Sequence, residues 1–203
     1  MNRLNQLSHE NNLHAAFMAT HEERFEGYRT RHEDGTAPRA VAAFNLFQTP
    51  EALASRMVEL AGILPHHSVL EPSAGLGRLL KPILARNPDR VHACEQSPDC
   101  CAEIYKQFPS VELSQGDFLE KHLGEFDRIV MNPPFKLRRD IKHIQHAAGH
   151  LAPGGVLVAL CLAGYKREET FRDHHNASIE RIPAGTFKAE GTQVETLLIT
   201  ITN

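Results

Sequence analysis

From about residue 46 onward, the apolar positions follow two alternating patterns, which predict alternating strands and helices. Short apolar runs bounded by Gly, Pro or charged residues indicate strands, whereas apolar positions three or four residues apart indicate helices. The predicted strands span residues 67–71, 91–95, 111–114, 126–131, 156–162, 179–183 and 195–201. Helices are predicted from residue 50, over 78–85, 98–107 and 140–150, and briefly after residue 162.

Local signals indicate where several of these elements begin and end. The triplet Thr49–Glu51 predicts a helix start, with threonine as the cap, proline in the first position and an acid in the first turn. Ser97 can cap the helix that follows it. The segment Pro153–Gly155 predicts a turn that closes the fourth helix.

The order of the elements predicts an α/β fold with a largely parallel sheet. Strands joined through helices form right-handed βαβ units, and such units build a doubly wound sheet with helices on both faces. The last two strands are joined instead by a loop of about ten residues that contains two glycines. This connection favours a hairpin, so the seventh strand is expected to run antiparallel to its neighbours.

Residues 1–45 differ from the rest and are expected to form an N-terminal helical arm, with the main domain at residues 46–203. The segment has four histidines, many charges and few β-branched residues, and its apolar positions follow a loosely helical spacing. One or two helices and a loop at residues 34–38 are expected. Such a segment is typically an arm packed on the core or a partly ordered tail.

Composition indicates an ordinary soluble protein rather than a membrane, fibrous or disordered one. Apolar residues make up 41% of the 203 residues and charged residues 23%. The longest strongly apolar run has eight residues, from Val156 to Ala163, whereas a membrane-spanning helix needs about 20. The chain opens on a polar stretch, so we expect no secretory leader and a cytoplasmic protein.

Charge and metal-binding residue types narrow the function further. The net charge of −3 argues against a protein that coats nucleic acid, although it leaves room for a local basic face. None of the four cysteines forms a C-x-x-C pair, and no acid completes a zinc pattern among the 13 histidines. We therefore predict no metal site and no disulfide framework, with histidines that are solvated or act as caps.

A glycine-containing turn follows the first predicted strand. Within Val69–Leu80, Gly75 and Gly77 let the backbone pass close to a ligand, and the helix start offers N–H groups. Leu80 replaces the third glycine of the dinucleotide fingerprint, and no Gly-Lys-Ser/Thr of a phosphate-binding loop follows. The strand ends on Glu71, and this acid favours a ligand with a positive group and a sugar over a pyrophosphate. A turn that uses glycine only for packing is the alternative.

Two further strands also lead to acids. Glu95 closes the second predicted strand, and Asp117 with Phe118 follows the third. The carboxyl ends of neighbouring strands share one crevice in a doubly wound sheet, so these acids are expected near Glu71. A carboxylate there can accept both hydroxyls of a ribose, and an acid followed by an aromatic ring can bind an adenine amino group and cover its ring. Each acid alone resembles an ordinary solvated side chain, whereas three at successive strand ends indicate a nucleoside site.

The fourth predicted strand ends in Asn132–Phe135, with the sequence Asn-Pro-Pro-Phe. An amino group conjugated to a base or a carbonyl is a poor nucleophile, because its lone pair is delocalised. The side-chain oxygen of Asn132 and the carbonyl of Pro133 can accept its two hydrogens, which localises the lone pair and aims it at an electrophilic methyl group. Two prolines stiffen this corner, and the phenylalanine can stack on a planar substrate. A segment that merely ends the strand is the alternative.

The order of the glycine turn, the three acids and the Asn-Pro-Pro-Phe segment resembles the class I S-adenosylmethionine-dependent methyltransferases. The segment is similar to the (N/D)-P-P-(Y/F) motif of their amino-methylating group. Phe47–Pro50 is similar to the F-x-T-P segment of the gamma-type DNA adenine-N6 methyltransferases. The resemblance covers about residues 44–201. It implies a Rossmann-like, doubly wound, seven-stranded sheet and S-adenosylmethionine as the cofactor.

The resemblance also implies residue roles. The residues implied to hold the target amine are Asn132, Pro133, Pro134 and Phe135. Those implied to hold the cofactor are Thr49, Glu71, Ser73, Ala74, Gly75, Gly77, Glu95, Gln96, Asp117 and Phe118. Of these, the first six would surround the methionine part, Glu95 would bind the ribose, and the last two the adenine.

The substrate is the least defined part of the prediction. Lys136, Arg138 and Arg139 follow the motif, and this basic cluster is expected to contact substrate phosphates. A basic loop that is merely solvated is the alternative. The F-x-T-P resemblance favours adenine N6 in DNA. By the same resemblance, adenine N6 or guanine N2 in RNA and a glutamine amide in protein stay open, as does a non-catalytic protein that binds cofactor or nucleic acid. Because the segment after residue 201 is too short for a target-recognition domain, weak sequence preference, an RNA substrate or a partner protein that supplies specificity is expected.

Overall fold

The computed structural model describes residues 48–175, 177–190 and 193–203, so the arm predicted at residues 1–45 lies outside the described residues. The strands are β1 (Ser68–Glu71), β2 (Arg90–Glu95), β3 (Glu112–Gln115), β4 (Phe126–Met131), β5 (Leu151–Leu162), β6 (Ser178–Ile182) and β7 (Thr196–Thr202). The helices are α2 (Glu51–Ala61), α3 (Leu80–Leu84), α4 (Pro98–Gln107), α5 (Arg139–Ala148) and α6 (Tyr165–His175). Short 3-10 helices are η1 (Phe118–Glu120), η2 (Lys136–Arg138) and η3 (Lys188–Glu190).

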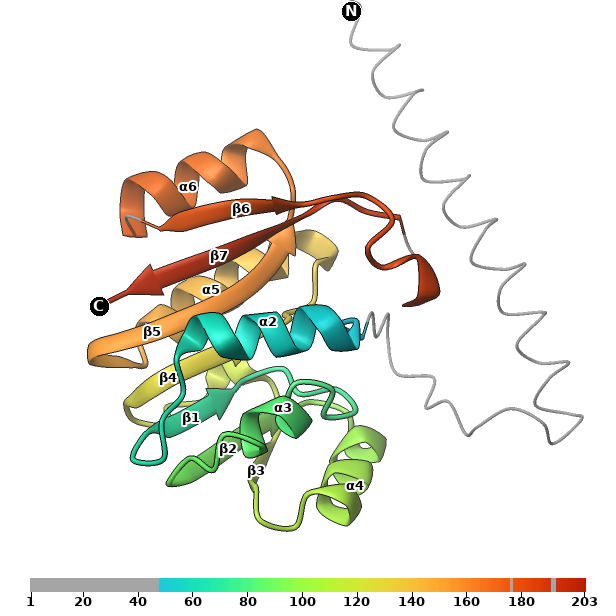
Figure 1. The fold of residues 1–203 in the computed structure, drawn as a ribbon, viewed down its shortest axis with the longest axis vertical. Coiled ribbons are helices and arrows are strands. Elements are labelled where there is room, and N and C mark those ends of the chain that lie inside the picture. The colour runs from blue at the N-terminus through green and yellow to red at the C-terminus, as the bar shows by residue number, and fades with distance from the viewer. Residues whose placement is uncertain (1–47, 176, 191–192) are drawn as a thin grey trace, which may run out of the picture. The chain divides into compact units, whose positions relative to one another are not determined.

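In the described part of the chain, the seven strands form one sheet in the order β3-β2-β1-β4-β5-β7-β6 (Figure 1). The pairs β3–β2, β2–β1, β1–β4 and β4–β5 are parallel, whereas β7 runs antiparallel to both β5 and β6. The predicted α/β class, the doubly wound sheet and the antiparallel last strand are therefore confirmed. The strand order reverses between β1 and β4, and ligands of such sheets bind outside the carboxyl ends at this switch point.

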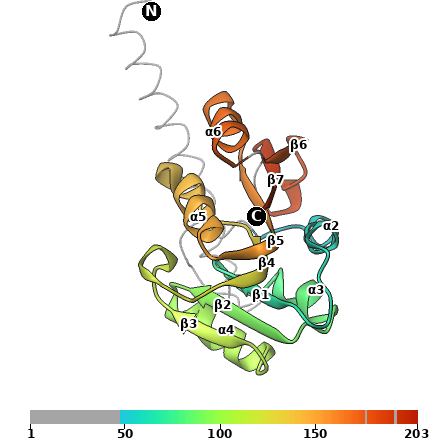
Figure 2. The same cartoon turned by 90° about the vertical axis from the view of Figure 1, so that its left-hand side faces the viewer.

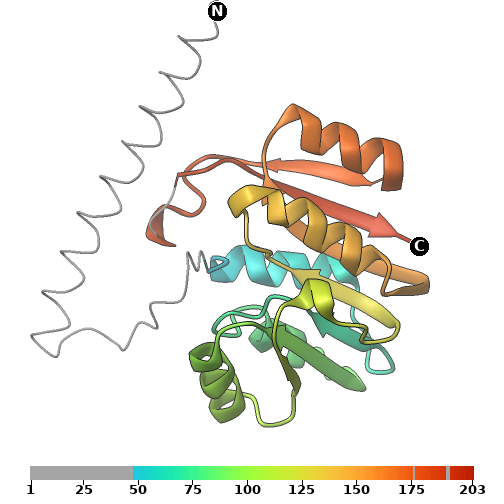
Figure 3. The same ribbon diagram turned by 180° about the vertical axis from the view of Figure 1, so that it is seen from behind.

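Helices cover both faces of the sheet. Figure 2 shows α5 and α6 on one side of the strands and α2 and α3 on the other, and Figure 3 shows α5 and α6 from behind. On the first-named side, Ile144 and Phe171 are fully buried in one apolar cluster. On the other side, Met57, Ile83 and Ile104 join a second cluster, so residues of α2, α3 and α4 contribute to the same apolar layer. Two apolar layers of this kind supply most of the stabilising burial.

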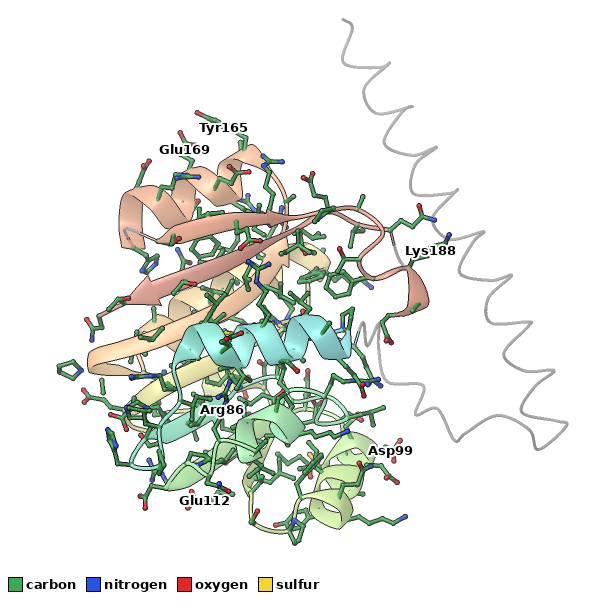
Figure 4. The ribbon with its side chains drawn as sticks, viewed as in Figure 1. Arg86, Asp99, Glu112, Tyr165, Glu169 and Lys188 are labelled. Atoms are coloured by element: carbon green, nitrogen blue, oxygen red, sulfur yellow. The ribbon has the colours of Figure 1, made fainter. Side chains whose placement is uncertain are left out.

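The outer surface of these helices is charged. Asp99 at the start of α4 and Glu169 on α6 project away from the sheet (Figure 4). In the ranges that the structure describes, no helix has the length and hydrophobicity needed to cross a membrane.

Two predicted helix starts differ from the observed ones. Pro50, not Thr49, occupies the cap position of α2, because the Thr49 side chain is buried and contacts another residue instead. Helix α3 begins at Leu80 rather than residue 78 and is only five residues long. Gly75 and Gly77 have φ values of 56° and 77°, so the left-handed backbone delays the helix. By contrast, Ser97 caps α4 as predicted, since its hydroxyl accepts from the Cys100 amide.

The turn predicted at Pro153–Gly155 is instead an irregular stretch within β5. The pairing of β4 with β5 shifts register beside it, and Gly154 has a φ of 74°. The stretch is bonded to the end of β7, because the Gly154 amide donates to the Asn203 carbonyl and the Asn203 amide donates to Gly155. Pairing with a distant strand thus extends β5 through residues that favour a turn locally.

A buried ion pair fixes the start of α5 against α6. Asp140 is completely buried, and its carboxylate accepts hydrogen bonds from Arg167 Nε at 2.8 Å and from Arg167 Nη2 at 3.3 Å. The same carboxylate accepts from the Leu162 amide at the end of β5, at 3.2 Å. One side chain therefore ties together three elements next to the carboxyl ends of the strands.

We predict that Arg167→Met lowers the free energy of unfolding by about 3 kcal/mol, because it leaves the Asp140 carboxylate buried without its cation. Chemical denaturation monitored by circular dichroism measures the change. Arg172→Met on the exposed part of α6 is the matched control, with an expected change of less than about 0.5 kcal/mol. Equal effects of the two substitutions would contradict a structural role for the Asp140–Arg167 pair.

Candidate active site

The carboxyl ends of four neighbouring parallel strands bring the predicted site residues to one edge of the sheet. Glu71 and Glu95 are the last residues of β1 and β2. Asn132 follows the end of β4, and Asp117 lies two residues beyond β3. Because β1 pairs with both β2 and β4, Glu71 lies between the other strand ends. This is the switch point at which a doubly wound sheet binds its ligands.

The glycine turn is anchored to the end of β2. The Gly75 amide donates to Glu95 Oε2 at 2.7 Å, and the Ser97 amide donates to Glu95 Oε1 at the same distance. The Ala74 amide donates to the Cys94 carbonyl at 3.1 Å. The amides of Ala74 and Gly75 in the turn are therefore bonded within the protein. Each Glu95 oxygen can accept one further hydrogen bond, such as that from a ribose hydroxyl.

The two turn glycines are required for backbone and packing reasons. Both have a positive φ, which side chains other than glycine adopt at a cost. A Cβ atom on Gly77 would lie only 2.4 Å from the Phe108 ring. Gly77 is therefore explained by packing against Phe108 alone, which was the alternative to a ligand-binding turn. Gly75 differs, because its amide donates a hydrogen bond to Glu95, a residue of the predicted site.

Glu71 is the most unusual charged group at this edge. The residue is 1% exposed, and its Oε2 has no hydrogen-bond partner within the described residues. Burial, and then the nearby charge of Glu95, raise the pKa of Glu71 well above its ordinary value. A buried carboxyl group beside a second acid is destabilising unless a cation or a proton accompanies it. The arrangement therefore suits a positively charged ligand.

Asn132 is oriented by a residue far away in the sequence. Its side-chain nitrogen donates to Thr49 Oγ1 at 3.2 Å, and Thr49 is 2% exposed. This bond uses one N–H of the amide, and the side-chain oxygen is the part of the group that can accept a hydrogen bond. The resemblance implied a place for Thr49 beside the cofactor, whereas its contact with Asn132 was not predicted, since no local pattern links positions 49 and 132.

A polar chain connects the ends of β1 and β3 through α5. Arg139 Nη2 donates to Asp117 Oδ2 at 2.6 Å and lies 3.5 Å from His143 Nε2. The other ring nitrogen of His143 lies 3.3 Å from Ser73 Oγ in the glycine turn. His143 is thus a site residue that the sequence reasoning left among solvated or capping histidines. In the sequence, only the position of His143 on the apolar face of the predicted helix could have indicated that it is buried at the site.

The pKa values of Asp117 and His143 in this polar network are set by burial and by the nearby Arg139. Burial raises the pKa of Asp117, but the hydrogen bonds from Arg139 and the Leu119 amide and the Arg139 charge outweigh it, so the pKa lies below its usual value. Burial, and then the Arg139 charge, lower the pKa of His143 to about 4. At neutral pH, Asp117 is therefore ionised and His143 is neutral.

Phe118 lies against two histidines of α5, His143 and His146, and against His150, which follows the helix. Phe118 itself is 2% exposed. The predicted contact of Phe118 with an adenine ring stays a prediction. Across the residues described, no group of three or more His, Cys, Asp or Glu side chains could hold a metal ion.

The predicted basic cluster is divided by the structure. Lys136 and Arg138 are exposed in η2, directly after the Asn-Pro-Pro-Phe segment, whereas Arg139 is bound to Asp117. Lys142 on α5 is also exposed. Pro133 is buried and Pro134 exposed, and Phe135 is partly buried against the apolar cluster of α2 and α3.

The sequence of the chain matches a known protein family. The profile of the methyltransferase small domain matches residues 49–182, which is most of the chain. The chain is a member of that family. The class I S-adenosylmethionine-dependent methyltransferase predicted from the sequence is therefore confirmed, together with S-adenosylmethionine as the cofactor.

Individual methyltransferases resemble this chain over part of their length. A probable ribosomal RNA small subunit methyltransferase A of Methanosarcina mazei is 34% identical over 89 residues, which cover 42% of this chain and 32% of that protein. The chain thus matches about a third of the length of this curated relative.

Solved structures share the fold at low sequence identity. A type I restriction-modification methyltransferase subunit of Streptococcus thermophilus superimposes with a TM-score of 0.64 and 17% identity, over 76% of this chain and 44% of that one. TrmN of Thermus thermophilus gives 0.60 and 20%, over 80% and 51%.

The residues of this methyltransferase fit its cofactor chemically. S-adenosylmethionine carries a sulfonium and an ammonium group. The edge of the sheet offers a buried carboxyl oxygen on Glu71, beside the Glu95 carboxylate, that has no hydrogen-bond partner among the residues the structure describes. A cation near Glu71 would relieve the repulsion between these acids. Glu95 also retains acceptor capacity for hydroxyl groups. The individual cofactor contacts predicted from the sequence stay predictions.

We predict that Glu71→Gln weakens S-adenosylmethionine binding at least about tenfold, because a carboxyl group that a cation would stabilise becomes a neutral amide. Isothermal titration calorimetry measures the affinity. The same substitution should stabilise the free protein increasingly as the pH rises, since a raised pKa means that wild type loses stability as Glu71 ionises. Glu59→Gln on the exposed surface of α2 is the control. Unchanged affinity would exclude Glu71 from the cofactor site.

We predict that His143 makes wild type less stable as the pH falls from 6.5 to about 4. Its pKa of about 4 in the folded protein lies below the ordinary 6.5, so the unfolded chain binds more protons in this range and stability is lost on acidification. The contribution is about 3 kcal/mol. Urea denaturation at several pH values compares wild type with His143→Gln, whose stability should depend less on pH, and with His122→Gln at an exposed position. Parallel curves for all three proteins would contradict the buried neutral state of His143.

Proposed function

We propose that this methyltransferase transfers a methyl group to an exocyclic amino nitrogen of a nucleic-acid base, with adenine N6 in RNA as the first target to test. The observation that carries the proposal is the Asn132 amide at the switch point. Its nitrogen is bonded to Thr49, and its strand lies next to the one that ends in Glu71. An amide acceptor in this place suits a substrate that offers an N–H group.

The residues of the site would each have a definite task in this reaction. When bound, S-adenosylmethionine supplies a methyl carbon attached to positive sulfur. Asn132 Oδ1 and the Pro133 carbonyl accept the two hydrogens of the target amine, so that its lone pair localises and points at that carbon. The cofactor would supply the methyl carbon together with its sulfur as the leaving group, which would take the electron pair of the broken bond, and the methylated nitrogen would release one proton to solvent water. The rigid corner at Pro133 and Pro134 keeps the acceptors in place beforehand.

A nucleic-acid substrate is supported by the charges beside the motif. Lys136, Arg138 and Lys142 are exposed, and among the residues that the structure describes they form no ion pair. Cations in this state are available for phosphates. The F-x-T-P resemblance favours DNA, whereas the Methanosarcina mazei relative is named for ribosomal RNA at 34% identity. We place RNA first for that reason, and a partner protein that selects the target remains part of the proposal.

The substrate class is tested by transferring tritiated methyl groups from S-adenosylmethionine to RNA, DNA and protein pools, followed by nucleoside analysis and mapping of the labelled position. We expect N6-methyladenosine in RNA. N6-methyladenine in DNA alone would move the substrate to DNA and keep the chemistry. Label in protein alone would contradict the nucleic-acid proposal.

We predict that Asn132→Ala lowers methyl transfer at least about a thousandfold, because the amine loses the acceptor that localises its lone pair. Cofactor affinity, measured by calorimetry, should stay within about twofold, since in the proposed reaction the amide binds the target amine and not the cofactor.

Substitutions of Thr49 distinguish positioning of the amide from direct participation. Thr49→Ser retains the hydroxyl that accepts from Asn132 and should keep most of the activity, whereas Thr49→Val removes the acceptor from a buried position and should lower kcat. Full activity of Asn132→Ala would mean that another group accepts the target amine.

A further inference from the structure

The turn directly after the Asn-Pro-Pro-Phe segment carries an exposed apolar side chain. Leu137 is 81% exposed, the largest exposed fraction of any large apolar side chain in the described residues. It lies between Lys136 and Arg138, which are exposed as well. A leucine in this position contributes little to the apolar core, so its identity calls for another explanation.

The backbone of the turn is strained at the same place. Leu137 has φ 55° and ψ 32°, and Arg138 has φ 58° and ψ 27°. Residues other than glycine, asparagine and aspartate rarely adopt this left-handed region, and two in succession are rarer still. Strain of this kind persists only where the surrounding structure imposes it, and it gathers at functional sites.

Both ends of the strained turn are held in place. Before it, the two prolines restrict the backbone. After it, Arg139 is bonded to Asp117 at 2.6 Å, and the buried Asp140 is bonded to Arg167. The exposed leucine is therefore presented on a rigid support within a few residues of the catalytic Asn132.

We propose that Leu137 is a wedge that enters the base stack of a paired nucleic acid and fills the space left when the target base turns out toward Asn132. A base within a duplex must leave the stack before its amino group can react, and apolar side chains inserted between bases offset the lost stacking. Lys136 and Arg138 would hold the phosphates on either side of the leucine. This inference rests on the proposed function and specifies its substrate as a base-paired strand.

The test compares Leu137→Asn with wild type. Asparagine tolerates the left-handed backbone, so the turn is retained while the apolar wedge is lost. Leu64→Asn, at a half-exposed leucine outside the site, is the matched control. The probes are an oligonucleotide that carries the mapped target and the same oligonucleotide annealed to its complement. Each is also prepared with 2-aminopurine in place of the target base, because its fluorescence reports unstacking without methyl transfer.

We expect Leu137→Asn to lower kcat/KM at least about tenfold on the paired strand and to stay within about twofold of wild type on the single strand. The fluorescence increase on binding the duplex should be lost in this variant only. Equal effects on both strands, or activity of wild type on the single strand alone, would overturn the wedge. So would a lower Tm of free Leu137→Asn than of Leu64→Asn, because the leucine would then be packed within the protein.

These outcomes separate the two proposals. If wild type methylates no nucleic acid, the proposed function fails and the wedge fails with it. If wild type methylates a paired strand and Leu137→Asn does so equally well, the proposed function stands and only the wedge is contradicted.

Discussion

The parallel pairing of β1 with β4 is the constraint on which the site depends. These strands are adjacent in the sheet although two other strands separate them in the sequence. Their pairing brings the end of the first βα unit, with Glu71 and the glycine turn, next to the Asn-Pro-Pro-Phe corner. The residues predicted to bind the cofactor and the predicted acceptor of the target amine therefore come from separate segments of the chain, which this pairing brings side by side.

Local signals predicted much of this arrangement because they act within a few residues. The serine cap of α4, the bounds of β4 and the acids at the strand ends depend on near neighbours or on the general rule for parallel sheets. The turn predicted at Pro153–Gly155 was wrong, because this stretch belongs to β5. Its conformation depends on pairing with β4 and on bonds to Asn203, which follows β7. A sequence pattern carries no such long-range information.

The same limit applies to the site itself. The position of its acids and of the Asn-Pro-Pro-Phe segment at one edge of the sheet could be predicted, because the carboxyl ends of parallel strands meet there, whereas their roles stay predictions. The bond from Asn132 to Thr49 and the contacts of His143 with Ser73 and Arg139 could not, because they depend on how α2 and α5 pack over the strands. Burial then decided the charge states: Glu71 and His143 are displaced toward their neutral forms, while Asp117 stays ionised beside a cation.

The Glu95 carboxylate has a consequence for how experiments at this edge are interpreted. One of its oxygens holds the glycine turn through Gly75, and the other holds the first residue before α4 through Ser97. A substitution at position 95 would free both loops at once, whatever its effect on a bound ribose. Weaker ligand binding by such a variant would thus combine the lost hydrogen bond to the ribose with the displacement of the two loops. A ligand that lacks the ribose hydroxyls separates the two contributions, because it removes the hydrogen bond and leaves the protein unchanged.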